Sequence, residues 1–137
     1  MSYTEKQLNK LFWGIAIDLQ EAIKDSLIQR GIKFTGDAIA SVRAEVQKDK
    51  IVVYMNDYLE YIEYGMPNPT SPEELRDWVE TKILEGYKGK NKERAIDVIS
   101  ENMAAHITQF GPRPNPFLRP VLHTELPLII QKNINGL

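Results

Sequence analysis

The chain has 137 residues, of which 42% are hydrophobic and 26% are charged, a balance typical of one water-soluble globular domain. It contains no cysteine, which excludes a disulfide scaffold, a thiolate zinc site, an iron–sulfur cluster and a cysteine nucleophile. Its 17 Lys and Arg and 19 Asp and Glu residues give a net charge of -2, which argues against dedicated DNA binding through phosphate neutralisation.

The sequence also lacks the features of a secreted or membrane-inserted chain. No apolar run approaches the roughly 18 to 20 residues of a membrane-spanning helix. The first ten residues, MSYTEKQLNK, are polar and unlike a signal peptide. We therefore expect an intracellular protein with no membrane partner.

The first predicted element is a long helix over residues 4–30. Two overlapping capping boxes, Ser2 to Glu5 and Thr4 to Gln7, favour a helix start. Gly31 favours a left-handed stop at the other end. Between them, apolar residues recur at steps of three and four: Leu8, Phe12, Ile15, Leu19, Ile23 and Leu27. This apolar face packs in the core or binds a partner helix.

A change of period after Thr35-Gly36 predicts a β-hairpin. One side of the segment carries Ala38, Ala40, Val42, Ala44 and Val46, and the other carries Ser41, Arg43, Glu45 and Gln47, as in a half-buried strand. Ile51, Val53 and Met55 alternate again after a polar turn over residues 47–50, so an antiparallel pair is the simplest arrangement. Because the buried side of the first strand is mostly Ala and Val, a helix can approach it closely.

The middle of the sequence predicts three more helices. Asn56 or Asp57 caps a short helix that ends at Gly65, before a proline-broken loop over residues 66–70. The sequence Ser71-Pro72-Glu73-Glu74 is a strong start for the next helix, which Gly86 ends. A basic loop over residues 87–92 then leads to a helix that ends at Gly111-Pro112.

The last stretch combines prolines with large apolar residues. Residues 113–116 should be extended, because each proline disfavours helix in the residue before it. A final helix should start at Phe117 or Leu118, and Pro127 predicts a kink or break in it. The stiff segment over residues 111–120 loses little entropy when it is fixed. It is an ordered start of the helix or a peptide-like docking arm.

Few side chains suggest chemistry. His106 and His123 both lie in helical pattern, and His123-x-Glu125 lacks the i, i+3 or i, i+4 spacing of metal ligands on one helix face. Glu60 and Glu63 form a pair of carboxylates that either does acid–base work or is solvated. A locally basic run is either a solvated loop or a contact with an acidic partner or with DNA in transit; it comprises Lys82, Lys88, Lys90, Lys92 and Arg94.

Two segments resemble the tail-component proteins of tailed bacteriophages, also called tail-completion or head-tail joining proteins. The first is Ile62-Glu63-Tyr64-Gly65, followed by a proline-bearing loop and a helix with Trp78. The second is Arg113-Pro114 and then Pro116-Phe117-Leu118-Arg119-Pro120-Val121-Leu122. The family signature is close to Arg-Pro-Phe-Leu-Arg-Pro-Ala-Leu. Asn115 and Pro116 interrupt it here, and Val121 replaces its alanine.

The resemblance implies a single α+β domain over residues 1–137, in which a long N-terminal helix and further helices pack on a small antiparallel sheet. It also implies a non-enzymatic virion protein of the neck. Such a subunit forms a homo-oligomeric ring, expected as a hexamer, between the head connector or head-completion proteins and the tail-tube or tail-terminator proteins. DNA meets the ring only in transit.

The resemblance implies structural roles for the signature residues and no catalytic, cofactor or metal site. The assembly candidates are Glu63, Gly65, Trp78, Arg113, Phe117, Leu118, Arg119 and Pro120. Two alternatives stay open. One is a prophage-encoded adaptor that binds a single protein, and the other is a small hydrolase that uses Glu60 or Glu63 with a histidine.

Overall fold

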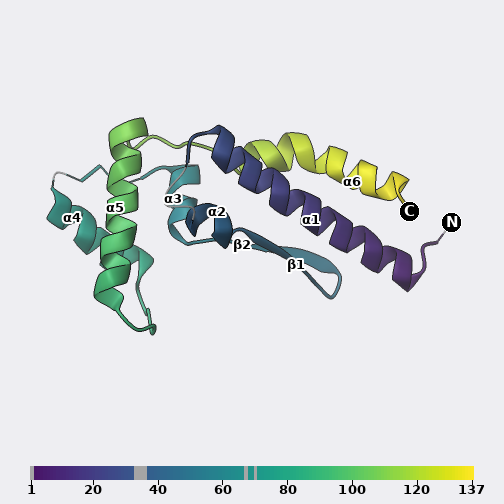
Figure 1. Cartoon of the computed structure of the whole chain (residues 1–137), viewed down its shortest axis with the longest axis horizontal. Helices are drawn as coiled ribbons and strands as arrows, with labels where there is room; N and C mark the ends of the chain where they lie inside the picture. Colours follow the sequence, from purple (N-terminus) through teal and green to yellow (C-terminus); the bar gives the residue numbers. More distant parts are fainter. Residues whose placement is uncertain (1, 33–36, 67, 70) are drawn as a thin grey trace. The chain divides into compact units, whose positions relative to one another are not determined.

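The computed structural model describes residues 2–32, 37–66, 68–69 and 71–137 and has an α+β fold (Figure 1). In chain order its elements, where η marks a π-helix, are α1 (Glu5–Gln29), α2 (Asp37–Ser41), β1 (Arg43–Gln47), β2 (Lys50–Tyr54), α3 (Tyr58–Tyr64), α4 (Pro72–Trp78), η1 (Val79–Ile83), α5 (Lys92–Phe110), η2 (Val121–Glu125) and α6 (Leu126–Asn135). Contacts group them into two compact units: unit 1, Met1–Asn56 with Pro116–Leu137, and unit 2, Asp57–Asn115. The predicted single domain therefore consists of two contact clusters.

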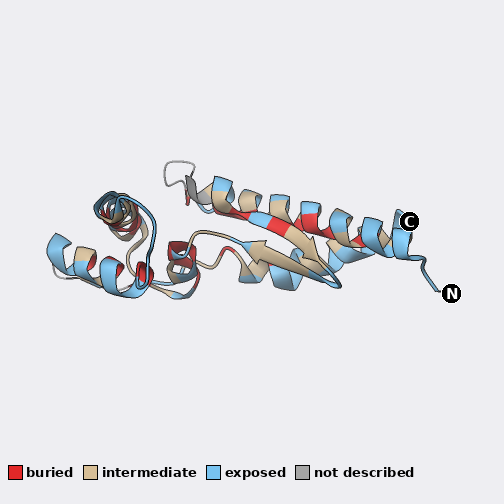
Figure 2. Cartoon of the chain, turned by 90° about the horizontal axis from the view of Figure 1, so that it is seen from below, coloured by how far each residue is buried: buried red, intermediate tan, exposed pale blue. Residues whose placement is uncertain are grey.

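Helix α1 confirms the long N-terminal helix. The Thr4 side chain accepts from the Gln7 N–H at 3.1 Å and the Thr4 N–H donates to Gln7 Oε1 at 2.9 Å, so this capping box forms. Since the helix begins after Thr4, it does not use the box predicted at Ser2. Its apolar residues form a buried line along one side (Figure 2): Leu11, Ile15, Ala16, Leu19, Ile23 and Leu27.

The hairpin is confirmed, but its first strand is shorter than predicted. β1 and β2 pair antiparallel with Val46 opposite Ile51, across the two-residue turn Lys48-Asp49. Residues 37–41, predicted partly as strand, form α2 instead. The alternation there depends on alanines, which are the best helix formers, so a period of two did not identify a strand. The break predicted at Thr35-Gly36 lies outside the described residues.

In unit 1, α1 contacts both the hairpin and α6 (Figure 1). The Gln20 side chain accepts the outward N–H of Ala44 in β1 at 2.9 Å, which ties the strand to the helix. On α6, Asn133 Nδ2 donates to Asp18 of α1 at 2.9 Å and to Ile129 O at 2.8 Å. A Cβ at Gly14 would clash with the Asn133 amide, so glycine within α1 permits this close approach.

The C-terminal helix starts at Arg119, slightly later than predicted, and changes register before Pro127. In η2 the Leu126 N–H donates to Val121 O, an i to i-5 bond. Because Pro127 has no N–H and its ring excludes the carbonyl four residues earlier, a wider turn forms just before it. This π-turn lies where a kink or break was predicted at Pro127. A second one, η1, extends α4 and was not predicted.

Unit 2 contains the remaining predicted helices. The Ser71 hydroxyl accepts the Glu74 N–H at 3.1 Å with Pro72 in the first turn, as expected for the start of α4. Gly86 and Gly111 have φ of 75° and 79° at the predicted stops. Asp57 precedes α3 but its side chain makes no capping hydrogen bond. In the predicted loop 66–70, Pro67 and Thr70 lie outside the described residues.

Candidate functional site

Within unit 2, two segments far apart in the sequence meet at their backbones. The Met66 N–H donates to Pro112 O at 3.0 Å, and the Asn115 N–H donates to Ile62 O at 2.8 Å. The first segment is the end of α3 and the second is the start of the proline-rich stretch. The first segment ends with the first resembling stretch, and the second contains Arg113-Pro114, the start of the other one; residues 116–122 of that stretch belong to unit 1.

Gly65 lies at the centre of this junction and has a backbone that few other residues adopt. Its φ is 119°, and it ends α3 through a 2.8 Å hydrogen bond from its N–H to Tyr61 O. A Cβ at this position would lie 3.6 Å from Pro114 Cγ, which is ordinary van der Waals contact. Glycine is therefore needed here for its backbone angle and not for space.

Glu63 and its neighbour Tyr64 face in opposite directions. Glu63 is only 1% exposed, whereas Tyr64 is 62% exposed. Burying an ionised carboxylate is costly, so the surroundings of a buried glutamate at the end of a short helix must compensate for that cost. Glu60, the other carboxylate of the predicted acid–base pair, is exposed on the same helix.

The second half of the signature is anchored inside unit 1. Phe117 is 1% exposed, and its carbonyl accepts a hydrogen bond from Ser26 Oγ of α1 at 2.7 Å. Ser26 was not predicted as a site residue, because a serine in a helical pattern gives no signal of its own. Pro120 precedes η2, Leu118 is half-buried and Arg119 is exposed.

Trp78 and Arg113 complete the predicted assembly candidates, and they lie in different environments. Trp78 is half-buried in unit 2 and meets Tyr61 of α3 edge to face, with ring centroids 4.6 Å apart. Such pairs add to the apolar burial of the two rings. Arg113 is exposed beside Pro114 in the extended stretch.

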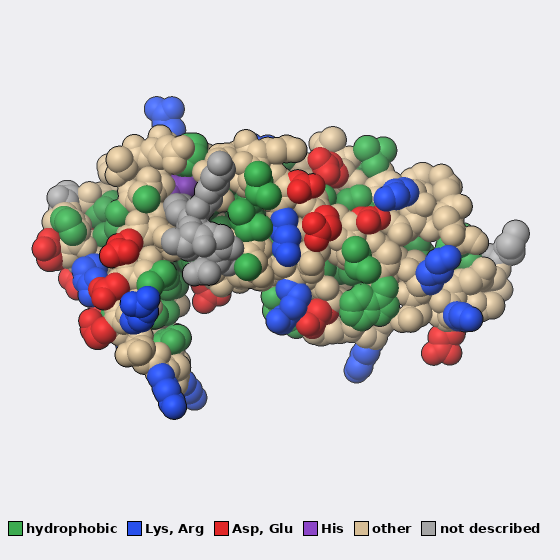
Figure 3. Space-filling model, in the orientation of Figure 1, with side chains coloured by type: hydrophobic (Ala, Val, Ile, Leu, Met, Phe, Trp, Pro, Cys, Tyr) green, Lys and Arg blue, Asp and Glu red, His purple; other side chains and the backbone are tan. Residues whose placement is uncertain are grey.

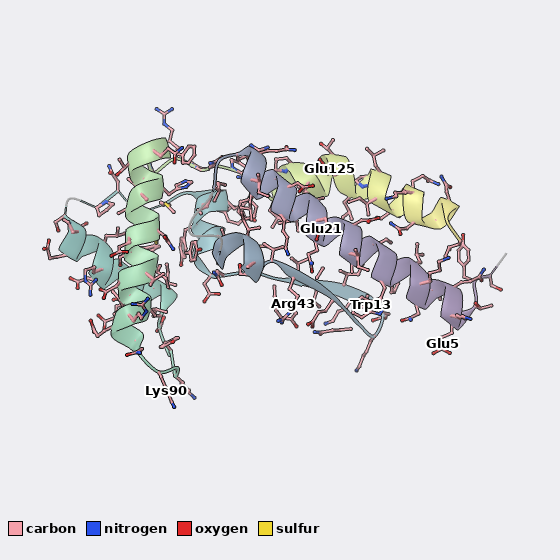
Figure 4. All side chains as sticks on the ribbon, viewed as in Figure 1. Glu5, Trp13, Glu21, Arg43, Lys90 and Glu125 are labelled. Carbon is pink, nitrogen blue, oxygen red and sulfur yellow. The ribbon has the colours of Figure 1, made fainter. Side chains whose placement is uncertain are left out.

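The basic run divides into solvent-exposed and paired side chains. Lys90 stands at the tip of the loop and points away from α5 (Figure 4), and Lys88 is also exposed. In the space-filling view, Lys and Arg side chains project from this part of the molecule (Figure 3). Lys92 instead lies 3.7 Å from Glu80 of η1.

An ion-pair cluster missed by the sequence reasoning links α4 to α5. Arg76 donates to the Asp97 carboxylate and also lies 3.5 Å from Glu93. The hydrogen bond to Asp97 raises the pKa of Arg76 above its ordinary value. Because these side chains are partly exposed, the cluster orients the two helices more than it stabilises them. Charge alone gave no signal, since most helices carry both signs.

The histidines have separate surroundings. His106 is 1% exposed on α5, and its ring centroid lies 4.8 Å from that of Phe110. Burial lowers the pKa of His106. His123 is exposed in η2 of unit 1. Among the described residues, no three His, Asp or Glu side chains group as metal ligands.

A groove of about 400 Å³ lies beside α4 and α5 within unit 2. Most of its exposed surface is apolar, although the Arg76–Asp97 pair and Glu101 are among the lining residues. The sequence did not predict this groove, because the helix side that forms its floor has the apolar pattern of a side packed in the core. The arrangement can hold apolar side chains of a partner.

No protein-family model matches the chain, and no curated protein or solved structure matches it either. In the described part of the chain, no helix is both long and apolar enough to cross a membrane.

Proposed function

We propose that the chain is a virion structural protein of a tailed bacteriophage, a tail-completion or neck subunit without enzymatic activity. In this role six copies form a ring that joins the tail to the head connector and lets DNA pass. The partners are other copies of the chain, the connector or head-completion protein, and the tail-tube or tail-terminator protein.

One observation supports this proposal above the others. Within unit 2, the Met66–Pro112 and Asn115–Ile62 hydrogen bonds hold Arg113-Pro114, the start of the second half of the resemblance, beside Gly65 at the end of the first half. Residues that form one structural feature give the resemblance more weight than a chance match of two short segments would have.

The remaining signature residues divide into an anchor and an exposed part. Phe117 is held inside unit 1, while Arg113 and Arg119 reach solvent. An anchored, proline-stiffened segment with outward arginines suits an assembly contact, because it loses little entropy on binding. The net charge of -2 also suits a ring through which DNA slides without tight binding.

The proposal is tested by inactivating the gene in the phage or prophage that encodes it. Electron microscopy of induced lysates should show filled heads and separate tails in place of joined particles, and supply of the chain from a plasmid should restore infectivity. Normal joined particles without the chain would refute the role.

Substitution of Arg119, an exposed arginine of the signature, gives a more specific version of the same experiment. Arg119→Ala should reduce complementation by at least tenfold, whereas Lys6→Ala, an exposed change on α1, should complement normally. An Arg119→Ala chain that is soluble and complements fully would remove the arginine from the assembly contact.

A further inference from the structure

The groove of unit 2 has the properties of an unfilled binding surface. It is lined on the α4 side by Pro72 and Leu75 and on the α5 side by Ser100, Ala104 and Ile107. Ser100 is 7% exposed, and its Oγ has no hydrogen-bond partner within the described structure. That hydroxyl is enclosed and does not face the groove, so the mostly apolar surface of the groove is what suits an apolar side chain of a partner.

The chain also carries an apolar helix that unit 1 covers only in part. None of the ten residues of α6, LPLIIQKNIN, is buried, and Leu128 is 68% exposed. Gln131 and Lys132 lie three and four residues after Leu128 and therefore share its side of the helix. This side offers one apolar anchor flanked by hydrogen-bond donors.

The charges of the two surfaces are complementary. Unit 1 carries ten Lys and Arg against eight Asp and Glu, whereas unit 2 carries seven against eleven. Locally, Lys132 is the one charged residue of α6, and its Nζ lies 3.6 Å from Asp18 Oδ2 of its own unit; Glu101 lines the groove beside the Arg76–Asp97 pair. Opposite charges favour encounter and fix which surfaces meet.

We propose that α6 of one copy docks in the α4–α5 groove of a second copy, with Leu128 as the anchor. This inference rests on the proposed function, which requires copies of the chain to bind one another. The two surfaces lie on different units, so the contact is heterologous, and repetition closes a ring or extends a filament.

The test uses two variants of the full chain, each blocked on one side. Leu128→Glu changes the helix and leaves the groove intact, and Ala104→Glu fills the groove and leaves the helix intact. Both positions are exposed, so circular dichroism should show normal folding. Analytical ultracentrifugation should show wild-type association up to millimolar concentration, and each variant alone should associate at least about tenfold more weakly.

Mixing the two variants gives the decisive measurement. The mixture keeps one good contact, so a one-to-one dimer should form and should grow no larger. Ile17→Glu, a matched change at a residue of α1 that is 58% exposed, should associate like the wild type. Two folded variants that stay monomeric when mixed, or a Leu128→Glu chain that assembles normally, would overturn the inference.

The result is separable from the phage role. A wild-type chain that remains monomeric at millimolar concentration overturns this contact. It leaves the proposed function to the particle phenotype, which depends on connector and tail proteins that the solution assay does not contain.

Discussion

The two units bury different kinds of side chain. In the described part of unit 1, the buried residues are almost all aliphatic or aromatic, and Ser26 is the one buried polar residue. Unit 2 is smaller and yet buries Glu63, Ser100, Asn102 and His106. Buried polar groups stabilise a fold only when they are hydrogen-bonded. We therefore expect the stability of unit 2 to depend more on solution conditions such as pH than the stability of unit 1 does.

The difference also bears on the proposed contact between copies. Leu128 of unit 1 is 68% exposed, whereas unit 2 buries four polar residues. The proposed contact therefore takes its apolar anchor from unit 1 and its groove from unit 2, the unit with more polar groups in its interior.

The chain provides a natural probe for each unit. Trp13 lies on α1 of unit 1, and Trp78 lies on α4 of unit 2. Fluorescence of variants that retain a single tryptophan, Trp78→Phe or Trp13→Phe, reports unfolding of one unit at a time.

The largest expected effect is in unit 1. Phe117→Ala removes a fully buried ring and leaves a cavity beside α1, which should lower the free energy of unfolding by about 3 to 5 kcal/mol. Urea denaturation followed by Trp13 fluorescence measures it. Leu128→Ala, at a residue 68% exposed, should change stability by less than about 0.5 kcal/mol. A small effect of Phe117→Ala would contradict the anchoring role of the signature.

The next effect is in unit 2 and depends on one backbone angle. Gly65→Ala forces a Cβ into a φ of 119°, which should cost about 1 to 3 kcal/mol when followed by Trp78 fluorescence. Gly136→Ala is the control, followed by Trp13 fluorescence because Gly136 lies in unit 1; its φ of -84° is allowed for any residue, so the change should be nearly neutral. Equal stability of the two variants would show that the backbone at the junction of α3 with the proline-rich stretch can shift to accommodate the Cβ.

Much of the local structure could be predicted from the sequence because its signals are local. The Thr4–Gln7 capping box and the Ser71 cap specify helix starts, and Gly65 and Gly111 specify stops, without help from distant residues. The short helix α2 was mistaken for strand because alanines fit both periods.

The candidate site was harder to predict, because it depends on pairs distant in sequence. The signature gave both Gly65 and Phe117, but neither the Met66–Pro112 backbone contact nor the Ser26 hydroxyl under Phe117 has a sequence signal. The groove needs two helices side by side, so periodicity alone shows only that each has an apolar side. Long-range contacts of this kind are not encoded in any single segment.

The smallest predicted effect is the pH dependence of unit 2, which arises from His106. Burial lowers the pKa of His106 below its ordinary value of 6.5, so the unfolded chain binds a proton first as the pH falls. This group therefore leaves stability unchanged above pH of about 6.5 and lowers it below, by at most about 1.4 kcal/mol for each pH unit. The loss stops once the pH passes the lowered pKa of the folded state.

Urea denaturation between pH 7 and pH 5, followed by Trp78 fluorescence, measures this slope before most carboxylates titrate. His106→Leu should flatten it, because an apolar side chain binds no proton in either state. His123→Gln, at an exposed position in unit 1, should leave the slope unchanged. Since the described part of unit 1 buries no histidine, its Trp13-detected stability should stay level over the same range. A slope that persists in His106→Leu would place the pH sensitivity of unit 2 on another buried group, Glu63 being the next to test.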